Sequence, residues 1–511
     1  MNNEKKLKIL LSGRLDLGPL ARHLRAFLET LSTNKNNLIY IDPFMIEHYR
    51  CDDFGTNDLL NQYLQIDNVK LADKHTEYDF SIFTDLLTLN YGDTFYKHFF
   101  KYKSKIKICY EVFDGSIPPL DWIDMINNNF DICCSPSVYI ADCLKKAGVT
   151  IPCFNLPCVV FNDELLAKQP KLSNKKIRFG FIGGAEQRKN PQKVIDAFYK
   201  AFKGNNDVEL YIHSAYSPEP EYVQGCFDRL NKYKKDCNIT FTFEKRLSKD
   251  EMYDLISTFS FYVFPTKTTG YFTTPCEALS VGIPIIVSDI PVHQELVQNL
   301  DESDGAFLIE AKETDIMIHS YLGNKFLGAQ HDMSVDAIAK QLKKAYDNFD
   351  ILFTQDKIEK RKDTARAYSL KALTPLFETL INPKEIVISK NQGIKDNTLF
   401  IDNETLLNKY KDINNDIKIG SDKKLSTFKY YIQNEPSVNL IEKICIECEK
   451  TKLALSKENS ELLNSKLMQK MLTKGVSANV NHIPRIIYEQ FSVYCRFKRF
   501  FNKIFKSNKK N

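Results

Sequence analysis

Residues 270–296 constrain the fold more than any other segment of the chain. They begin as a loop that ends at Thr274, and a helix follows with proline at its first position and Glu277 three residues after the cap. Gly282 then leads into residues 285–287, an apolar run that is typical of a buried strand. The segment therefore predicts a unit of loop, helix and strand.

A second segment, residues 177–202, runs from a strand through a loop into a helix. Its apolar strand ends in a double glycine, Gly183 and Gly184, and an Asn-Pro pair then provides an N-cap and a first-turn proline for the helix. Arg188 and Lys189 fall in the loop between the two elements. The sequence thus predicts a basic pair in a strand-to-helix loop.

Between these segments lie three short β-rich runs, separated by polar or helical stretches, at residues 208–213, 239–243 and 260–264. This alternation predicts a parallel sheet with helices on both faces, in which ligands bind at the carboxyl ends of the strands. Both segments above come just after such ends. We therefore expect the two segments to share one cleft.

The N-terminal part of the chain predicts a strand, a glycine-containing loop and an amphipathic helix. Residues 8–12 are an apolar run that ends at Gly13, and leucines at helical spacing follow between residues 20 and 31. His23 falls within that helical pattern. We interpret it as a partly buried surface histidine, because titratable residues on helices usually are.

Residues 270–296 resemble the donor-binding segment of the retaining, nucleotide-sugar-dependent glycosyltransferases of family 4. They begin Gly-Tyr-Phe-Thr-Thr-Pro-Cys-Glu-Ala-Leu-Ser-Val-Gly-Ile-Pro, where the family reads roughly Glu-Gly-Phe-Gly-Leu-Pro-x-x-Glu-Ala-Met-Ala-x-Gly-x-Pro. Arg188 and Lys189 are similar to the Arg-Lys-Asn-Pro variant of the family's basic loop. The resemblance covers residues 1–380 and implies the GT-B architecture, an α/β fold in which two Rossmann-like domains face a central cleft.

The resemblance also implies roles for individual residues. Arg188 and Lys189 would neutralise the diphosphate as it leaves the donor, and Glu277 would accept hydrogen bonds from the ribose. The remaining residues expected at the donor are Gly13, Gly183, Gly184, Thr269, Gly270, Thr273 and Thr274. Glu277 also has an alternative role that needs no ligand, because Thr-Pro-Cys-Glu is a capping-box sequence.

Thr269 departs from the family pattern, which has a glutamate eight residues before the second one. A threonine hydroxyl can hydrogen-bond a sugar hydroxyl, but it carries no charge. Either the donor sugar differs from the common hexoses or the site is weakened, and the sequence leaves both alternatives open.

Residues 106–158 are similar to relatives that have the same basic loop, which share a Trp-Glu or Tyr-Glu pair and a Pro-x-x-Trp sequence. Glu111 and Asp114 end a strand pattern here, at the expected cleft. Either carboxylate could orient an acceptor hydroxyl, and Glu111 could equally cap the following turn. We take both as candidate acceptor-binding residues.

The chain contains no Asp-x-Asp triplet. Cations from side chains can do the neutralising work of a divalent metal ion at a departing diphosphate. We therefore expect metal-independent transfer with retention of configuration. A nucleotide-diphosphate sugar would be the substrate, and we expect no cofactor.

The length of 511 residues predicts two domains and an extension. We expect an acceptor domain at 1–170, a donor domain at 171–356, a closing helix at 357–383 that crosses back to the first domain, and a mostly helical extension at 384–511. The chain has a net charge of +5, but the residues from Arg485 onward have a net charge of +7. The basic character therefore belongs to the tail.

Residues 483–506 of this tail have basic positions on one helical face and aromatic positions on the other. We expect a helix on an anionic membrane surface, or alternatively a helix packed on the extension or on another subunit. Thirteen cysteines without regular spacing indicate free thiols in a reducing cytoplasm, and we see no targeting segment. No nucleic-acid module precedes the tail. The expected location is cytoplasmic, peripheral on the inner face of the cell membrane.

These features predict a glycosyltransferase that moves a sugar to a glycan or lipid-linked acceptor, in bacterial surface polysaccharide or lipopolysaccharide synthesis. Two other functions fit the same scaffold. One is a different GT-B enzyme, such as a glycan phosphorylase or an epimerase, and transfer without inorganic phosphate would exclude the phosphorylase. The other is a non-catalytic scaffold, whose signature is binding of a nucleotide sugar without turnover.

Overall fold

A computed structural model gives the positions of most residues up to 419. The described residues are 6–48, 55–87, 98–172, 176–217, 219–243, 246–319, 325–387, 394–395, 397–401, 403–413 and 418–419. The amphipathic segment expected at 483–506 lies outside them, as does most of the expected extension.

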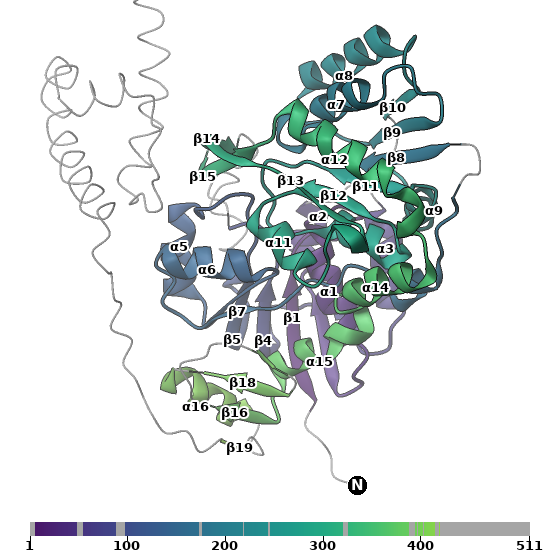
Figure 1. Cartoon of the computed structure of the whole chain (residues 1–511). Helices are drawn as coiled ribbons and strands as arrows, with labels where there is room; N and C mark the ends of the chain where they lie inside the picture. Colours follow the sequence, from purple (N-terminus) through teal and green to yellow (C-terminus); the bar gives the residue numbers. More distant parts are fainter. Residues whose placement is uncertain are drawn as a thin grey trace, which may run out of the picture.

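Seven parallel strands form the first sheet, in the order β3-β2-β1-β4-β5-β6-β7 (Figure 1). They are β1 (Leu7–Ser12), β2 (Asn37–Ile41), β3 (Val69–Leu71), β4 (Glu77–Phe83), β5 (Lys103–Tyr110), β6 (Ile132–Ser135) and β7 (Cys153–Asn155). The helices among the described residues of this domain are α1 (Ala21–Leu31), α2 (Pro43–His48), α3 (Thr56–Leu64), α5 (Leu120–Asn129) and α6 (Val138–Lys146).

The sequence of β1 explains why helices cover both faces of this sheet. Ile9 and Leu11 belong to an apolar core that includes Phe27 of α1, whereas Leu10 belongs to a second core that includes Ile126 of α5. Successive strand residues point to opposite faces, so a strand that is apolar throughout needs cover on both sides.

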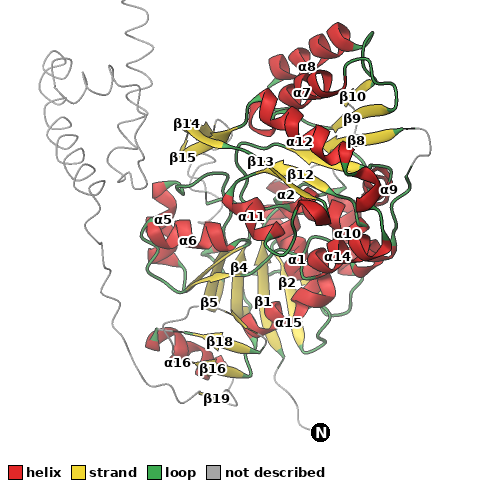
Figure 2. Cartoon of the chain, viewed as in Figure 1, coloured by secondary structure: helices red, strands yellow, loops and turns green. Residues whose placement is uncertain are grey.

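Six parallel strands form the second sheet, in the order β10-β9-β8-β11-β12-β13 (Figure 2). They are β8 (Ile177–Ile182), β9 (Val208–Ser214), β10 (Ile239–Phe243), β11 (Phe261–Phe264), β12 (Ile285–Ser288) and β13 (Ala306–Ile309). The described helices are α7 (Pro191–Phe202), α8 (Pro220–Tyr233), α9 (Lys249–Ser257), α10 (Thr273–Val281), α11 (Pro291–Val297), α12 (Val335–Asp347) and α13 (Phe349–Leu352). The expected pair of Rossmann-like α/β domains is confirmed.

A β-hairpin that the sequence analysis did not predict connects the second domain to the first. It consists of β14 (Lys312–His319) and β15 (Lys325–Asp332), which pair antiparallel. The backbone oxygen of Leu327 accepts hydrogen bonds from the backbone N–H groups of Ser116 and Ile117, at 2.9 and 3.1 Å. Gly328 has φ +82° at this contact, where the Ser116 side chain leaves no room for a Cβ. The hairpin thus holds a loop of the first domain.

The closing segment consists of two helices, α14 (Gln355–Arg366) and α15 (Leu370–Ile381). This corrects the single helix expected at 357–383. The hydroxyl of Ser369 accepts a hydrogen bond from the third residue of α15 and so begins a new helix. α14 lies against α10, whereas α15 lies against α1, where the Phe377 ring is 4.7 Å from the Phe27 ring. The chain therefore crosses back between the two helices.

A small sheet and a helix follow, at the end of the first domain that faces away from the second domain (Figure 1). The elements are β16 (Glu385–Val387), β17 (Ile394–Lys395), β18 (Thr398–Phe400), α16 (Glu404–Ile413) and β19 (Lys418–Ile419). Lys409 forms an ion pair with Asp131 at 2.5 Å, and the buried Tyr410 donates to the Leu380 carbonyl at 2.6 Å. Among the described helices, none has both the length and the apolar character of a membrane span.

The buried Arg361 of α14 gives a test of the packing between the second domain and the closing helices. Its guanidinium donates to the carbonyl oxygens of Gly282, Asp304 and Leu352 at 2.7 to 2.8 Å. In Arg361→Met these three oxygens lose their donors, so we expect the free energy of unfolding to fall by about 3 kcal/mol or more. Arg366→Met is the control, because Arg366 is exposed on the same helix. Equal melting temperatures in the two variants would contradict this account.

Candidate active site

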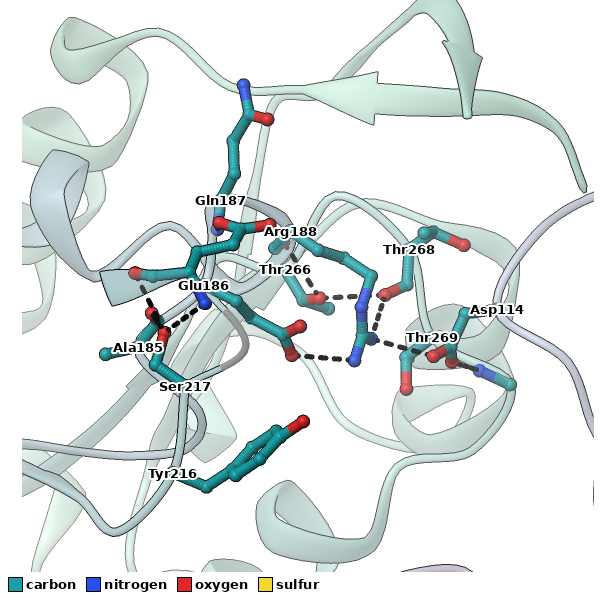
Figure 3. Close-up of polar contacts among 12 residues, drawn as sticks. Asp114, Ala185, Glu186, Gln187, Arg188, Tyr216, Ser217, Thr266, Thr268 and Thr269 are labelled. Atoms are coloured by element: carbon teal, nitrogen blue, oxygen red, sulfur yellow. Dashed lines mark hydrogen bonds and ion pairs between the residues drawn. The ribbon is translucent and has the colours of Figure 1, made fainter. Parts of the chain in front are cut away.

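The two segments that the sequence analysis singled out lie at the carboxyl ends of strands of the second sheet. Gly183 and Gly184 follow β8, and the loop of residues 265–272 follows β11 and leads into α10. Figure 3 shows Arg188 of the first segment next to this second loop, with Asp114 of the first domain beside both. The two segments therefore lie side by side, at the contact between the domains.

Arg188 lies in a short 3₁₀ helix, η3 (Gln187–Lys189), whose geometry is set by Asn190. Asn190 is buried, has φ 62° in the left-handed region, and donates from its side chain to the Pro265 carbonyl at 2.9 Å. The backbone oxygen of Arg188 accepts a hydrogen bond from the Lys267 N–H at 2.8 Å. The turn that carries Arg188 is thus bonded to the loop after β11.

The Arg188 side chain contacts two carboxylates (Figure 3). It forms ion pairs with Glu186 at 2.9 Å and with Asp114 at 3.1 Å, and it donates to the Thr268 carbonyl at 3.1 Å. Burial alone would lower the pKa of Arg188, but the two carboxylates outweigh it and raise the pKa. The side chain is therefore a fixed and fully charged cation.

Lys189 has a different environment. Its Nζ lies 4.6 Å from the centre of the Phe264 ring. Burial, with a smaller contribution from the neighbouring Arg188, lowers the pKa of Lys189 to about 8. An anion bound next to both cations would oppose this lowering.

Helix α10 begins at Thr273 and has Phe272 as its N-cap, with no capping hydrogen bond from a side chain. The capping box considered as an alternative for Glu277 is therefore not formed. Thr273 and Thr274 lie in the first turn, where backbone N–H groups have no partner inside the helix and the helix dipole is positive. This end of α10 favours an anion.

Glu277 is 3% exposed and accepts a hydrogen bond from the Arg22 guanidinium of α1 at 2.8 Å. Burial raises the pKa of Glu277, and the positive charge of Arg22 opposes that rise. The residue proposed to hold a ribose thus pairs with a cation of the other domain.

Thr269 and Gly270 are buried at the domain contact. The Thr269 hydroxyl donates to the Tyr271 carbonyl at 2.7 Å. Gly270 donates its backbone N–H to Asp114 at 2.9 Å, and a Cβ at this position would lie 2.5 Å from the Phe113 carbonyl oxygen. Only glycine permits this approach of the two backbones.

Glu111 and Asp114, the two candidate acceptor-binding residues, have different environments. Glu111 is fully buried, and neither of its carboxylate oxygens has a hydrogen-bond partner among the described residues. The suggestion that it caps the following turn is therefore wrong. Burial, together with the nearby Asp85, raises the pKa of Glu111 well above its usual range. Asp114 is partly exposed and pairs with Arg188.

The loop after β1 places Gly13 against the Thr84 side chain and Arg14 against Asp85. Arg14 makes two hydrogen bonds of 2.8 Å to that carboxylate. His23 is buried and not on the surface as expected, because its ring packs edge-on against a tyrosine of β5. Burial lowers the pKa of His23 to about 4, so the ring is neutral at physiological pH.

Three residues of this region were missed by sequence reasoning: Arg22, Glu186 and Tyr216. Arg22 meets Glu277 across a separation of 255 residues, for which no local pattern exists. Glu186 stands two residues before Arg188, and acidic residues next to a basic loop could have signalled it. The Tyr216 ring is half-exposed on the loop after β9, and Figure 3 shows it near Glu186.

Comparisons with known proteins agree with this geometry. Residues 176–322 match the family model described as glycosyl transferases group 1. No match was found among curated proteins.

Several solved structures share the fold. HepE of Anabaena in complex with UDP-glucose has a TM-score of 0.52 at 13% identity, covering 73% of this chain and 99% of HepE. A glycosyltransferase from Rickettsia africae has a TM-score of 0.52 at 11% identity, covering 74% and 99%. Sucrose-phosphate synthase from Thermosynechococcus elongatus has a TM-score of 0.52 at 12% identity, covering 73% and 98%. The chain thus has the GT-B fold, with a match to the group 1 glycosyltransferases over the second domain.

Proposed function

We propose that this protein is a glycosyltransferase that takes a nucleotide-diphosphate sugar and transfers the sugar, with retention, to a glycan or lipid-linked acceptor. The observation that carries the proposal is the position of Arg188 and Lys189. They lie after β8, beside the loop that leads into α10, within the domain that matches the group 1 glycosyltransferases.

Cleavage of the bond between sugar and diphosphate leaves negative charge on the diphosphate. Arg188, Lys189 and the N-terminal turn of α10 would stabilise that charge as it develops. One such fixed cation contributes about 3 kcal/mol to lowering a barrier. Glu277 would accept hydrogen bonds from ribose hydroxyls, as the resemblance to family 4 implies. The same resemblance is the support for retention.

The acceptor would approach from the first domain. Asp114 is the better placed of the two candidates, since its side chain is 27% exposed whereas Glu111 is fully buried. The HepE and sucrose-phosphate synthase structures support the fold of such an enzyme but not the identity of either substrate.

A non-catalytic nucleotide-sugar-binding scaffold is the second candidate. Its support comes from Thr269, which stands where family 4 has a glutamate and whose hydroxyl proton is already donated to the Tyr271 carbonyl. Such a protein would bind nucleotide sugars and leave them intact.

Incubation with a panel of nucleotide sugars in phosphate-free buffer tests the proposal. We expect release of the nucleoside diphosphate from at least one donor, equally in EDTA, because side-chain cations stabilise the leaving group. With an acceptor present, NMR of the product should show the donor's anomeric configuration. Activity that EDTA abolishes and manganese restores, or an inverted product, would contradict the mechanism. Binding without any release would favour the scaffold.

The pKa of Lys189 predicts how affinity depends on pH. The lowered pKa means that the cation is present below about pH 8 and is lost as the pH rises through that value. Calorimetric affinity for the nucleoside diphosphate should therefore weaken by about tenfold between about pH 7.5 and about pH 9.5. Lys189→Arg should flatten the profile, because arginine keeps its charge. The same pH profile in both proteins would show that Lys189 is not the titrating group.

Association with an anionic membrane through residues 483–506 is a further part of the proposal, based on the sequence pattern. Each basic residue near an anionic surface contributes about 1 kcal/mol. Full-length protein should float with anionic liposomes, and a variant without residues 483–511 should not. Neutral liposomes are the control. Equal flotation of the two proteins would contradict the membrane role and favour a helix packed on the extension or on another subunit.

A further inference from the structure

Two of the ion pairs among the described residues link the first domain to the second and use a residue assigned to donor binding. Arg22 of α1 pairs with Glu277 of α10 at 2.8 Å. Asp114, after β5, pairs with Arg188 of η3 at 3.1 Å. In each pair one member comes from each domain.

In each pair, the residue from the first domain occupies a position where we expect a group of the nucleotide sugar. Asp114 lies where a phosphate is expected, and Arg22 lies where the ribose hydroxyls are expected. Asp114 places a carboxylate oxygen on the Arg188 guanidinium, as a phosphate oxygen of the diphosphate would be placed. Arg22 donates an N–H to Oε1 of Glu277, the carboxylate to which ribose hydroxyls would donate. A donor that used Oε1 of Glu277 and the Asp114-facing side of the Arg188 guanidinium would have to compete with the protein's own side chains.

The surroundings hold the two pairs in place and limit the access of solvent to them. The side chains of Glu277 and Arg188 are only 3% and 15% exposed, and those of their partners Arg22 and Asp114 are 22% and 27% exposed, so solvent screens the pairs only in part. Asp114 is also held by the Gly270 N–H, and Arg188 also contacts Glu186. Arg25 and Lys249 add positive charge near Glu277, and Glu29 adds negative charge near Arg22.

We propose that Asp114 and Arg22 are internal substitutes for the donor: they occupy Arg188 and Glu277 in the empty protein, and the nucleotide displaces both. This rests on the proposed function. The two residues thereby lower donor affinity, and displacement frees the Asp114 carboxylate on the side from which the acceptor would approach. Donor binding would then precede acceptor binding.

The proposal predicts that removing a substitute strengthens nucleotide binding. UDP, GDP and ADP are titrated separately by calorimetry into wild type, Asp114→Asn, Arg22→Gln and the double variant. Asparagine keeps an oxygen for the Gly270 N–H while losing the charge that competes with phosphate. For the nucleotide that binds, we expect the dissociation constant to fall about fivefold or more in each single variant, and further in the double variant.

Two controls separate competition from a general effect on the fold. Arg22→Lys keeps the cation and should stay close to wild type, and Lys105→Gln removes a 3.0 Å ion pair with Asp79 inside the first domain and should leave affinity unchanged. Melting temperatures without nucleotide should fall in Asp114→Asn and Arg22→Gln, and the rise on adding nucleotide should be larger than in wild type.

The outcomes distinguish a failure of the proposed competition from a failure of the proposed function. Unchanged or weaker binding in both single variants overturns the competition, whatever their melting temperatures. If no nucleoside diphosphate binds wild type or any variant, the proposed function itself fails.

Discussion

The ion pairs and hydrogen bonds of the Arg188 guanidinium are the interaction on which the rest of the site depends. They join the loop after β8, the loop after β11 and the loop after β5, through Glu186, Thr268 and Asp114. A guanidinium this buried needs its charge balanced, and the two carboxylates balance it, while its Nε has no hydrogen-bond partner among the described residues. Because Asp114 belongs to the first domain, the same requirement brings the two domains together at this point.

Charge is distributed unevenly at the contact between the domains. Glu111 and His23 are buried in the first domain. Burial raises the pKa of Glu111 and lowers the pKa of His23, so it favours the neutral form of each side chain. In the pairs Arg22–Glu277 and Arg188–Asp114, each side chain instead lies against a group of opposite charge, at 2.8 and 3.1 Å. Lys189 faces an aromatic ring instead. An incoming diphosphate would therefore meet cations that are already positioned.

The sequence predicted those features that depend on local patterns. Apolar runs bounded by glycine and proline predicted β8, β11 and β12, and the Asn-Pro pair predicted the start of α7. The basic pair was placed after β8 for the same reason. The resemblance to family 4 added the GT-B arrangement, which sequence periodicity cannot determine.

The features that were missed depend on contacts between distant residues. A capping box was plausible for Glu277 on spacing alone, but Arg22 competes for the same carboxylate from another domain. His23 fits a surface position in a helical pattern, and only the packing of α1 against β5 buries it. The strands β14 and β15 have no strong alternation of apolar and polar residues. Their hydrogen bond to Ser116 joins two backbone groups, so no particular side chain in the sequence indicates it.

Amide hydrogen exchange with and without a nucleotide sugar that binds in the panel experiment tests most directly whether the two segments form one donor site. Ligand binding slows exchange where it stabilises backbone hydrogen bonds or excludes solvent. The account predicts that residues 183–190 and residues 270–282 are protected together, over the same range of ligand concentration. Protection of only one segment, or protection confined to another part of the chain, would contradict it.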